Sequence, residues 1–336
     1  MMKAAIYDGK ELSINEIPRP ELSATQVLIQ VKAVGICGTD LAIINGSLPT
    51  PTPIILGHEL SGEIIEIGDK VDPKWINKKV TSEINSNIDF DCYYCKLKQY
   101  SQCISRKALG IDIDGALAEY IAVESYLLHE IPENISFEEA TFIEPLAAAY
   151  QIFEMMPLDE NDKIIAIYGL GKLGMLITQV ALKKGLKLIV VDGSHEKINL
   201  AKNFGAQFQI NRFDCINVPD SIKTYTNGLG ADIVIDATGN PLALKDVIAS
   251  CRTRGKIHVK STHGVDTPIN LTDLVVRELT LYTSRCGPFE KAIEGLKSRE
   301  IKVDKLITKK FDLKDIGKAV NFHMKNPEHI KAIIRI

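Results

Sequence analysis

A glycine-rich turn, set between an apolar run and a helical pattern, constrains this chain more than any other feature. The apolar run, residues 164–168, is typical of a buried parallel strand. Gly169, Gly171 and Gly174 follow it with G-x-G-x-x-G spacing, and apolar residues then recur with helical period. Strand, glycine turn and helix in this order are the context in which the motif indicates a dinucleotide-binding unit.

Each of the three glycines in the turn has a distinct physical role. Gly169 permits the tight turn, Gly171 lets a pyrophosphate approach the backbone, and Gly174 lets the helix pack closely on the strand. The free N–H groups and the positive dipole end of the helix then favour the phosphates. An empty α/β sheet, in which the glycines only pack a helix, is the alternative. We predict that the cofactor contacts Gly169, Leu170, Gly171, Lys172, Leu173 and Gly174.

Two later positions bear on the same cofactor. A second apolar run ends in Asp192, about 20 residues beyond the glycines, where an acid binds the ribose 2′-hydroxyl and repels the 2′-phosphate of NADP. No arginine follows closely, although His195 and Lys197 are near. Thr238 follows the fourth strand candidate at the carboxyl edge, where ligands of such sheets bind. The sequence therefore favours NAD over NADP, with Asp192 and Thr238 among the cofactor contacts.

Six strand candidates alternate with helical or loop segments beyond residue 163, which predicts an α/β class with a doubly wound parallel sheet. They are residues 164–168, 187–191, 207–210, 232–236, 256–260 and 279–283. Residues 1 to about 35 are β-rich, residues 60–67 are a further strand candidate, and residues 138–150 have a helical pattern around Pro145.

Three residues of zinc-binding types lie in the β-rich part: Cys37, His58 and Glu59. A thiolate, an imidazole and a carboxylate form a three-ligand site with a fourth position left open, as catalytic zinc requires. A buried cysteine or a lone histidine is more often structural, so the hypothesis depends on the combination. Glu144 lies in an otherwise apolar segment and needs a partner, for which a metal or a hydrogen-bonded helix end would serve.

A second cluster has regular close spacing. Asp89, Cys92 and Cys95 are three residues apart, and Cys103 follows after seven more residues. This spacing in an intracellular chain is typical of a structural zinc lobe, with an aspartate at the first position where a cysteine is usual. We expect zinc bound by three thiolates and one carboxylate, and the alternative is a lobe that has lost its metal.

Composition excludes several classes of function. The chain has 336 residues, a net charge of −3 with scattered charges and no basic patch, so nucleic acid is not an expected partner. No apolar run is long enough to span a membrane, and the first residues have no signal-peptide pattern. Seven cysteines without that pattern favour a reducing, cytoplasmic location, where thiols bind metals or react.

Taken together, these residues resemble the zinc-dependent medium-chain dehydrogenase/reductase family, in particular its polyol, sugar and threonine dehydrogenase branch. The motifs occur in the family's order over most of the chain: GICGTD (35–40), GHE (57–59), the cysteine lobe (89–103), GALAEY (115–120), IEPLAAA (143–149), GLGKLG (169–174) and DATG (236–239).

The resemblance implies a GroES-like catalytic domain, residues 1–148, completed by a return segment, residues 287–336. A Rossmann NAD-binding domain, residues 149–286, would be inserted between them. The implied activity is transfer of a hydride from the CH–OH group of an alcohol, polyol or sugar to NAD. The family also implies a homodimer or homotetramer, with the sixth strand region as the interface.

Residue roles follow from the same resemblance. Cys37 and His58 match the zinc ligands, and Glu59 and Glu144 match two acids that share the remaining ligand place. Thr39 matches the hydroxyl that receives the substrate proton, whereas Ala42 stands where many relatives have a histidine that ends the proton relay.

Two further positions bear on the substrate. Asn85 aligns with a position that often lines the substrate pocket, and Glu83 is close to it. An amide and an acid would favour a polyol or sugar, although an asparagine can also hold a turn.

Two other functions remain open at this point. A quinone or enone reductase can use the same scaffold without zinc, but such enzymes lack the set of Cys37, His58 and Glu59. A non-catalytic NAD-binding redox sensor is compatible with Ala42 and Asp89.

Overall fold

A computed structural model describes residues 1–336, which form two compact units. The β-rich unit consists of Met1–Glu144 together with Phe289–Ile336, and the α/β unit consists of Pro145–Pro288. The sequence-based expectation placed these boundaries after residues 148 and 286. Both termini of the chain therefore belong to the β-rich unit.

The β-rich unit contains three sheets. The largest has the order β10-β6-β5-β3-β18-β17, with β9 also paired to β3, and the others are β2-β1-β4 and β7-β8. Its strands are β1 (Met2–Tyr7), β2 (Leu12–Ile17), β3 (Gln26–Gly35), β4 (Ile54–Ile55), β5 (Glu59–Ile67), β6 (Lys79–Ser82), β7 (Asn85–Ser86), β8 (Lys107–Ala108), β9 (Tyr120–Glu124), β10 (Leu128–Glu130), β17 (Ile307–Asp312) and β18 (Lys331–Arg335).

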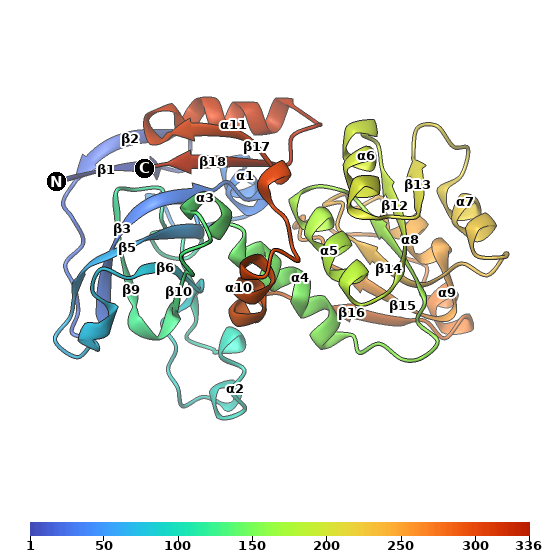
Figure 1. The fold of residues 1–336 in the computed structure, drawn as a ribbon, viewed down its shortest axis with the longest axis horizontal. Coiled ribbons are helices and arrows are strands. Elements are labelled where there is room, and N and C mark those ends of the chain that lie inside the picture. Colours follow the sequence, from blue (N-terminus) through green and yellow to red (C-terminus); the bar gives the residue numbers. More distant parts are fainter. The chain divides into compact units, whose positions relative to one another are not determined.

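The helices of this unit are short. They are α1 (Gly38–Ile44), α2 (Tyr93–Lys96), α3 (Phe137–Ala140), α10 (Phe289–Lys297) and α11 (Ile316–Lys325), with 3-10 turns at Pro73–Trp75, Tyr100–Gln102, Ser125–Leu127, Asp304–Leu306 and Leu313–Asp315. Within the unit, α11 lies along β17 and β18, and α2 projects as a separate lobe (Figure 1).

The returning C-terminal strand completes the largest sheet. β18 pairs with β3 in antiparallel fashion, with Ile333 opposite Gly35, and with β17 in parallel fashion. Alternate residues of β3 and β5, including Ile29, Leu60 and Ile64, are fully buried and form one apolar core with residues of β1 and β18. A segment more than 270 positions away from Glu59 thus helps to build its surroundings.

The α/β unit is built on one parallel sheet with the order β13-β12-β11-β14-β15-β16. The predicted doubly wound sheet of six strands is confirmed. Its strands are β11 (Ile164–Tyr168), β12 (Lys187–Asp192), β13 (Phe208–Asn211), β14 (Ala231–Asp236), β15 (Cys251–Val259) and β16 (Thr280–Thr283).

Helices cover both faces of this sheet. α7 and α8 pack on the face that carries Ala166, Ile189 and Val234, whereas α5 and α6 contact each other and strands β11 to β13. The helices are α5 (Lys172–Lys183), α6 (His195–Phe204), α7 (Val218–Tyr225), α8 (Leu244–Ser250) and α9 (Leu271–Val276). None of the helices combines the length and the apolar character that a membrane crossing requires.

The helical pattern predicted over residues 138–150 forms two helices instead of one. α3 ends at Ala140, and α4 runs over Ile143–Met155. Pro145 lies in the first turn of α4, where the missing backbone N–H costs no helical hydrogen bond.

Candidate functional site

Cys37, His58 and Glu59 meet in the β-rich unit. Their ligand atoms all lie within 4.8 Å of one another. The antiparallel pairing of β3 with β5 sets Gly35 opposite Glu59, which brings the segment before α1 next to the start of β5. His58 is 3% exposed and Glu59 is 0% exposed. The structure therefore brings together three of the four residues predicted for the catalytic metal.

A buried aspartate organises two of these residues. Asp40 Oδ2 accepts a hydrogen bond from the backbone N–H of Cys37 at 2.8 Å, and Oδ1 accepts one from Gly57 at 3.3 Å. His58 Nδ1 lies 3.6 Å from Asp40 Oδ1 and has no closer hydrogen-bond partner. Asp40 belongs to the GICGTD motif, but sequence reasoning gave it no role.

The electrostatic surroundings of His58 are strongly negative. Burial lowers the pKa of His58, but the charges of Cys37, Asp40 and Glu144 outweigh burial and raise the pKa to about 10. A buried imidazole that is held beside so many anionic groups marks a place that attracts a cation.

Close glycine packing fixes the turn before His58. Gly57 has φ +93°, which favours glycine, and the backbone of Gly110 presses against it, so that a Cβ on Gly110 would lie 2.6 Å from the Gly57 carbonyl oxygen. Gly115, the first residue of the GALAEY motif, packs on the same oxygen. The function of this motif in the structure is thus to hold the Gly57-His58-Glu59 turn in place.

The donor set fits zinc. Sulfur, nitrogen and oxygen donors at one buried place, including an imidazole nitrogen without a hydrogen-bond partner, are the types that zinc binds with a position left for a further ligand. Thr39 Oγ1 lies 3.6 Å from Cys37 Sγ, so the predicted proton acceptor is adjacent to the centre. Glu144 is outside the 4.8 Å cluster, although its charge acts on His58.

Asp89, Cys92, Cys95 and Cys103 form a second cluster, again with ligand atoms within 4.8 Å. Asp89 Oδ1 accepts hydrogen bonds from the backbone N–H groups of Asp91 and Cys92, each at 2.9 Å. Asp89 Oδ2 lies 3.2 Å from Cys103 Sγ. The backbone N–H groups of Cys92 and Asp91 lower the pKa of Asp89, so the carboxylate is ionised and faces the thiols as a metal ligand would.

The glycine turn of the α/β unit has the geometry of a phosphate cradle. A Cβ on Gly171 would have no atom within 4 Å, whereas a Cβ on Gly174 would collide with the carbonyl oxygen of Gly169. Gly171 is thus open to a ligand and Gly174 is required for packing. Leu170, Lys172 and Leu173 complete the predicted contact set, and α5 begins at Lys172.

The predicted acid at the end of β12 is held in place by backbone groups. Asp192 Oδ2 accepts a hydrogen bond from Leu170 N at 2.6 Å, and Oδ1 accepts one from Ser194 N at 2.9 Å. Thr238 donates through Oγ1 to Asp236 at 2.7 Å, directly beyond β14 at the carboxyl edge of the sheet. Within the α/β unit, the sheet edge therefore carries the cofactor residues that the sequence predicted.

Comparison with known proteins decides the family. Residues 23–133 match the model of the alcohol dehydrogenase GroES-like domain, and residues 173–298 match that of the zinc-binding dehydrogenases. D-arabitol-phosphate dehydrogenase of Enterococcus avium is 31% identical, over 98% of this chain and 94% of its own length. The chain belongs to the zinc-type medium-chain dehydrogenase/reductase family.

Other members resemble this dehydrogenase over their whole length. Sorbitol dehydrogenase of Halalkalibacterium halodurans is 29% identical, over 99% of both chains. The alcohol dehydrogenase RspB of Escherichia coli CFT073, solved with NADH, superimposes with a TM-score of 0.91 at 28% identity, over 100% of this chain and 99% of that one. The predicted family, its GroES-like and Rossmann domains and its oxidoreductase class are confirmed.

The predicted substrate residues have structural partners in this dehydrogenase. Asn85 is buried in β7, and its Oδ1 accepts a hydrogen bond from Arg106 at 3.3 Å. Glu83 Oε1 lies 3.0 Å from His129 Nε2, and the His129 ring stacks on Phe289. Arg106 and His129 were not identified from the sequence, because nothing in their local sequence indicates these long-range contacts.

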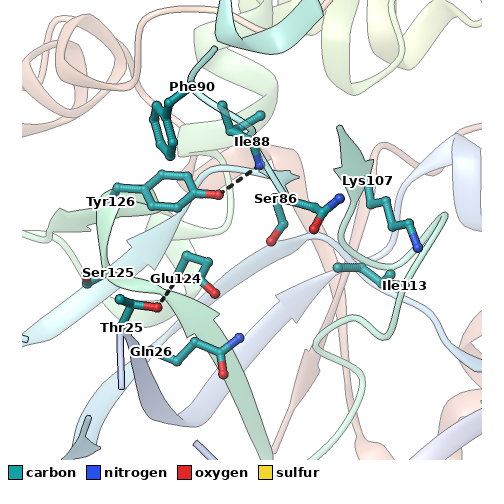
Figure 2. Close-up of a pocket in the computed structure, with 11 residues that line it drawn as sticks. Thr25, Gln26, Ser86, Ile88, Phe90, Lys107, Ile113, Glu124, Ser125 and Tyr126 are labelled. Atoms are coloured by element: carbon teal, nitrogen blue, oxygen red, sulfur yellow. Dashed lines mark hydrogen bonds between the residues drawn. The ribbon is translucent and has the colours of Figure 1, made fainter. Parts of the chain in front are cut away.

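A cavity of about 560 Å³ lies elsewhere in the β-rich unit, at the base of the cysteine lobe. Figure 2 shows Phe90 beside Tyr126, whose hydroxyl accepts a hydrogen bond from the Ile88 N–H at 3.3 Å. Thr25 donates to Glu124 on the opposite side of the cavity. None of the predicted site residues lines this cavity, so it is distinct from the metal centre.

Proposed function

We propose that this dehydrogenase oxidises the CH–OH group of a polyol or sugar, transferring hydride to NAD at a zinc centre held by Cys37, His58 and Glu59. The observation that carries the proposal is the convergence of these three ligands, two of them buried, beside Thr39 and Asp40. Glu144, the second acid of the branch, would share the remaining ligand place.

The residues have complementary tasks. Zinc held there would supply Lewis acidity that lowers the pKa of the substrate hydroxyl. Asp40 fixes the backbone of Cys37 and of Gly57, the residue that precedes His58. Thr39 accepts the proton of the substrate hydroxyl and gives its own hydroxyl proton to solvent, since Ala42 offers no group for a further transfer.

The choice of NAD rests on Asp192. Both carboxylate oxygens are fixed by backbone N–H groups of the glycine turn and of Ser194, so the negative charge stays where a 2′-phosphate would lie. The nearby His195 side chain is directed to another acid, since its Nε2 lies 3.4 Å from Asp214 Oδ2. We expect Asp192→Ala to reduce the preference for NAD over NADP at least about tenfold in kcat/KM.

The substrate class rests on polar groups and on relatives. Glu83 and Asn85 offer a carboxylate and an amide, which favour hydroxyl-rich substrates because a polar pocket rejects those that leave it unpaired. The names of the relatives, sorbitol and D-arabitol-phosphate dehydrogenase, point in the same direction.

The cysteine lobe is proposed as a structural zinc site with one carboxylate ligand. Three thiolates and Asp89 would complete a tetrahedron without an open position. With all seven cysteines free of disulfides, a reducing cytoplasmic location fits this use of thiols.

A homodimer or homotetramer through the sixth strand of the α/β sheet is proposed as the assembly. β16 pairs only with β15 and leaves its other edge open, and Leu281 on it is exposed. Val275 and Val276 of the preceding helix are also exposed, so an apolar patch adjoins the open edge. A charge introduced by Leu281→Lys should shift the mass measured by light scattering toward the monomer.

The decisive experiment measures zinc per chain together with NAD-linked turnover on a panel of polyols and sugars. Wild type is compared with Cys37→Ser and Cys92→Ser, and Cys215→Ser serves as a control thiol outside both clusters. Two zincs in wild type, one lost in each of the first two variants, with turnover lost in Cys37→Ser, would support the proposal. Zinc lost only in Cys92→Ser, with bound NAD but no turnover, would indicate the non-catalytic NAD-binding alternative.

A further inference from the structure

A fully buried ion pair lies directly beside the metal centre. Lys331 Nζ contacts Glu59 Oε2, and both side chains are 0% exposed. Lys331 is the first residue of β18 and lies 272 positions from Glu59 in the sequence. Nζ also donates to the carbonyl oxygen of Thr141 at 3.1 Å and lies 4.6 Å from the ring centre of Phe142. The lysine therefore joins Glu59 to the segment that leads into Glu144.

The protein leaves room for this contact at one position. A Cβ on Gly35 would lie 2.7 Å from Glu59 Oε2 and would collide with the end of Lys331. Gly35 is the last residue of β3 and lies opposite Glu59 in the sheet. A side chain at position 35 would therefore force the buried ends of Lys331 and Glu59 to shift.

The charges show why the lysine matters for a metal. Glu59 cannot remain ionised in so buried a place without a cation, because an isolated buried carboxylate is costly. Lys331 can neutralise the Glu59 carboxylate, and so can a metal that Cys37 and His58 also bind. A carboxylate that is already paired with an ammonium group is a weaker metal ligand, because the ammonium charge neutralises the carboxylate and repels a second cation.

We propose that Lys331 is a positioning residue that weakens Glu59 as a metal ligand and holds its carboxylate in one orientation. The inference rests on the metal centre proposed above. Lys331 and the metal compete for Glu59, so the lysine keeps the position open that a substrate hydroxyl needs. When the metal leaves, Lys331 continues to balance the buried carboxylate and keeps the centre folded.

The test measures zinc release from the loaded protein to a coloured chelator, with folding followed by circular dichroism. Lys331→Met removes the cation that competes with zinc for Glu59, so zinc release should slow about tenfold or more. In a Glu59→Gln background, Lys331→Met should alter the rate of zinc release less than about twofold, because the lysine acts on zinc only by way of the Glu59 carboxylate. Lys310→Met is the matched control, since Lys310 pairs with Glu138 at the surface of the neighbouring strand.

The outcomes of this test distinguish a positioning role of Lys331 from a merely structural role. Release that is unchanged or faster in Lys331→Met would overturn the proposal. The metal-free variant is expected to unfold more readily than metal-free wild type and to regain stability when zinc is added. A variant that does not fold even with zinc would also overturn it, because zinc alone should balance Glu59. Zinc in wild type that survives Cys37→Ser would instead contradict the proposed metal centre.

Discussion

His58 and His258 are two buried histidines whose surroundings shift the pKa in opposite directions. His58 is 3% exposed and His258 is 0% exposed, and each has ring nitrogen without a hydrogen-bond partner. Negative groups raise the pKa of His58 to about 10 in spite of burial. Burial and the nearby charge of Lys260 lower the pKa of His258 to about 4.

The contrast shows that burial alone does not mark a functional histidine. His258 lies in β15 between Ile235 of β14 and Tyr282 of β16, within a packed sheet. Nothing there stabilises a positive charge, so the ring acts as a neutral core side chain. At His58 the neighbours are the sulfur of Cys37 and two acids, and the same side chain lies where a metal can bind.

The largest expected difference between the two histidines is in catalysis. His58→Asn should lower kcat/KM by more than about 10³-fold, about 4 kcal/mol of transition-state stabilisation, because the metal loses a ligand. His258→Leu should leave kcat/KM within about threefold, since this ring is not among the proposed ligands. Steady-state kinetics with zinc analysis checks both variants. Equal losses in the two variants would contradict the distinction.

The space around the metal centre is expected to tolerate less change than the surface next to it. Gly35→Ala should destabilise the β-rich unit by about 3 kcal/mol, because the added methyl group meets Glu59 and Lys331. Gly38→Ala is the control, since a Cβ there meets nothing within 4 Å. Urea unfolding followed by tryptophan fluorescence compares them, as Trp75 lies in this unit. Similar midpoints for both variants would mean that the centre can rearrange.

Local patterns made much of this molecule predictable. The glycine turn and Asp192 could be identified because the strand, the turn and the acid lie within 30 residues of sequence. The cysteine lobe was recognisable for the same reason, as its four donors lie between residues 89 and 103. In both cases the spacing of residues along the sequence is enough to predict the geometry that a dinucleotide or a zinc ion needs.

Long-range contacts were not predictable in this way. The role of Lys331 and the contact of Asp40 with Gly57 depend on strand pairings that join separate segments, and no periodicity encodes them. His58 and His258 cannot be assigned their different protonation states from the sequence alone, because the charges that distinguish them come from other elements of the fold. Glu83 and Asn85 were chosen by resemblance, and their partners His129 and Arg106 became visible only in the structure.

Acid should affect the two histidines differently. The unfolded chain protonates a histidine near pH 6.5, whereas folded His258 takes up a proton only near pH 4. The unfolded state therefore binds more protons in this window, and the free energy of unfolding falls as the pH falls, by about 2 kcal/mol at pH 5. His258→Leu should remove this part of the pH dependence. Unfolding curves of both proteins between pH 7.5 and pH 5 measure it, and equal slopes would contradict it.

The smallest effect is expected at neutral pH, where His258 is uncharged in both states. Its two ring nitrogens are buried without hydrogen-bond partners, whereas in the unfolded chain they form hydrogen bonds with water. Folding therefore loses these hydrogen bonds, and this loss lowers the free energy of unfolding. Leucine has a similar size and no polar atoms, so His258→Leu should raise the free energy of unfolding of the α/β unit by about 1 kcal/mol at pH 7.5. A thermal unfolding midpoint that rises by a few degrees would agree with this expectation. A lower midpoint would mean that the His258 ring binds a buried water. His258 would then resemble His58, whose proposed partner, a metal, is also not part of the protein.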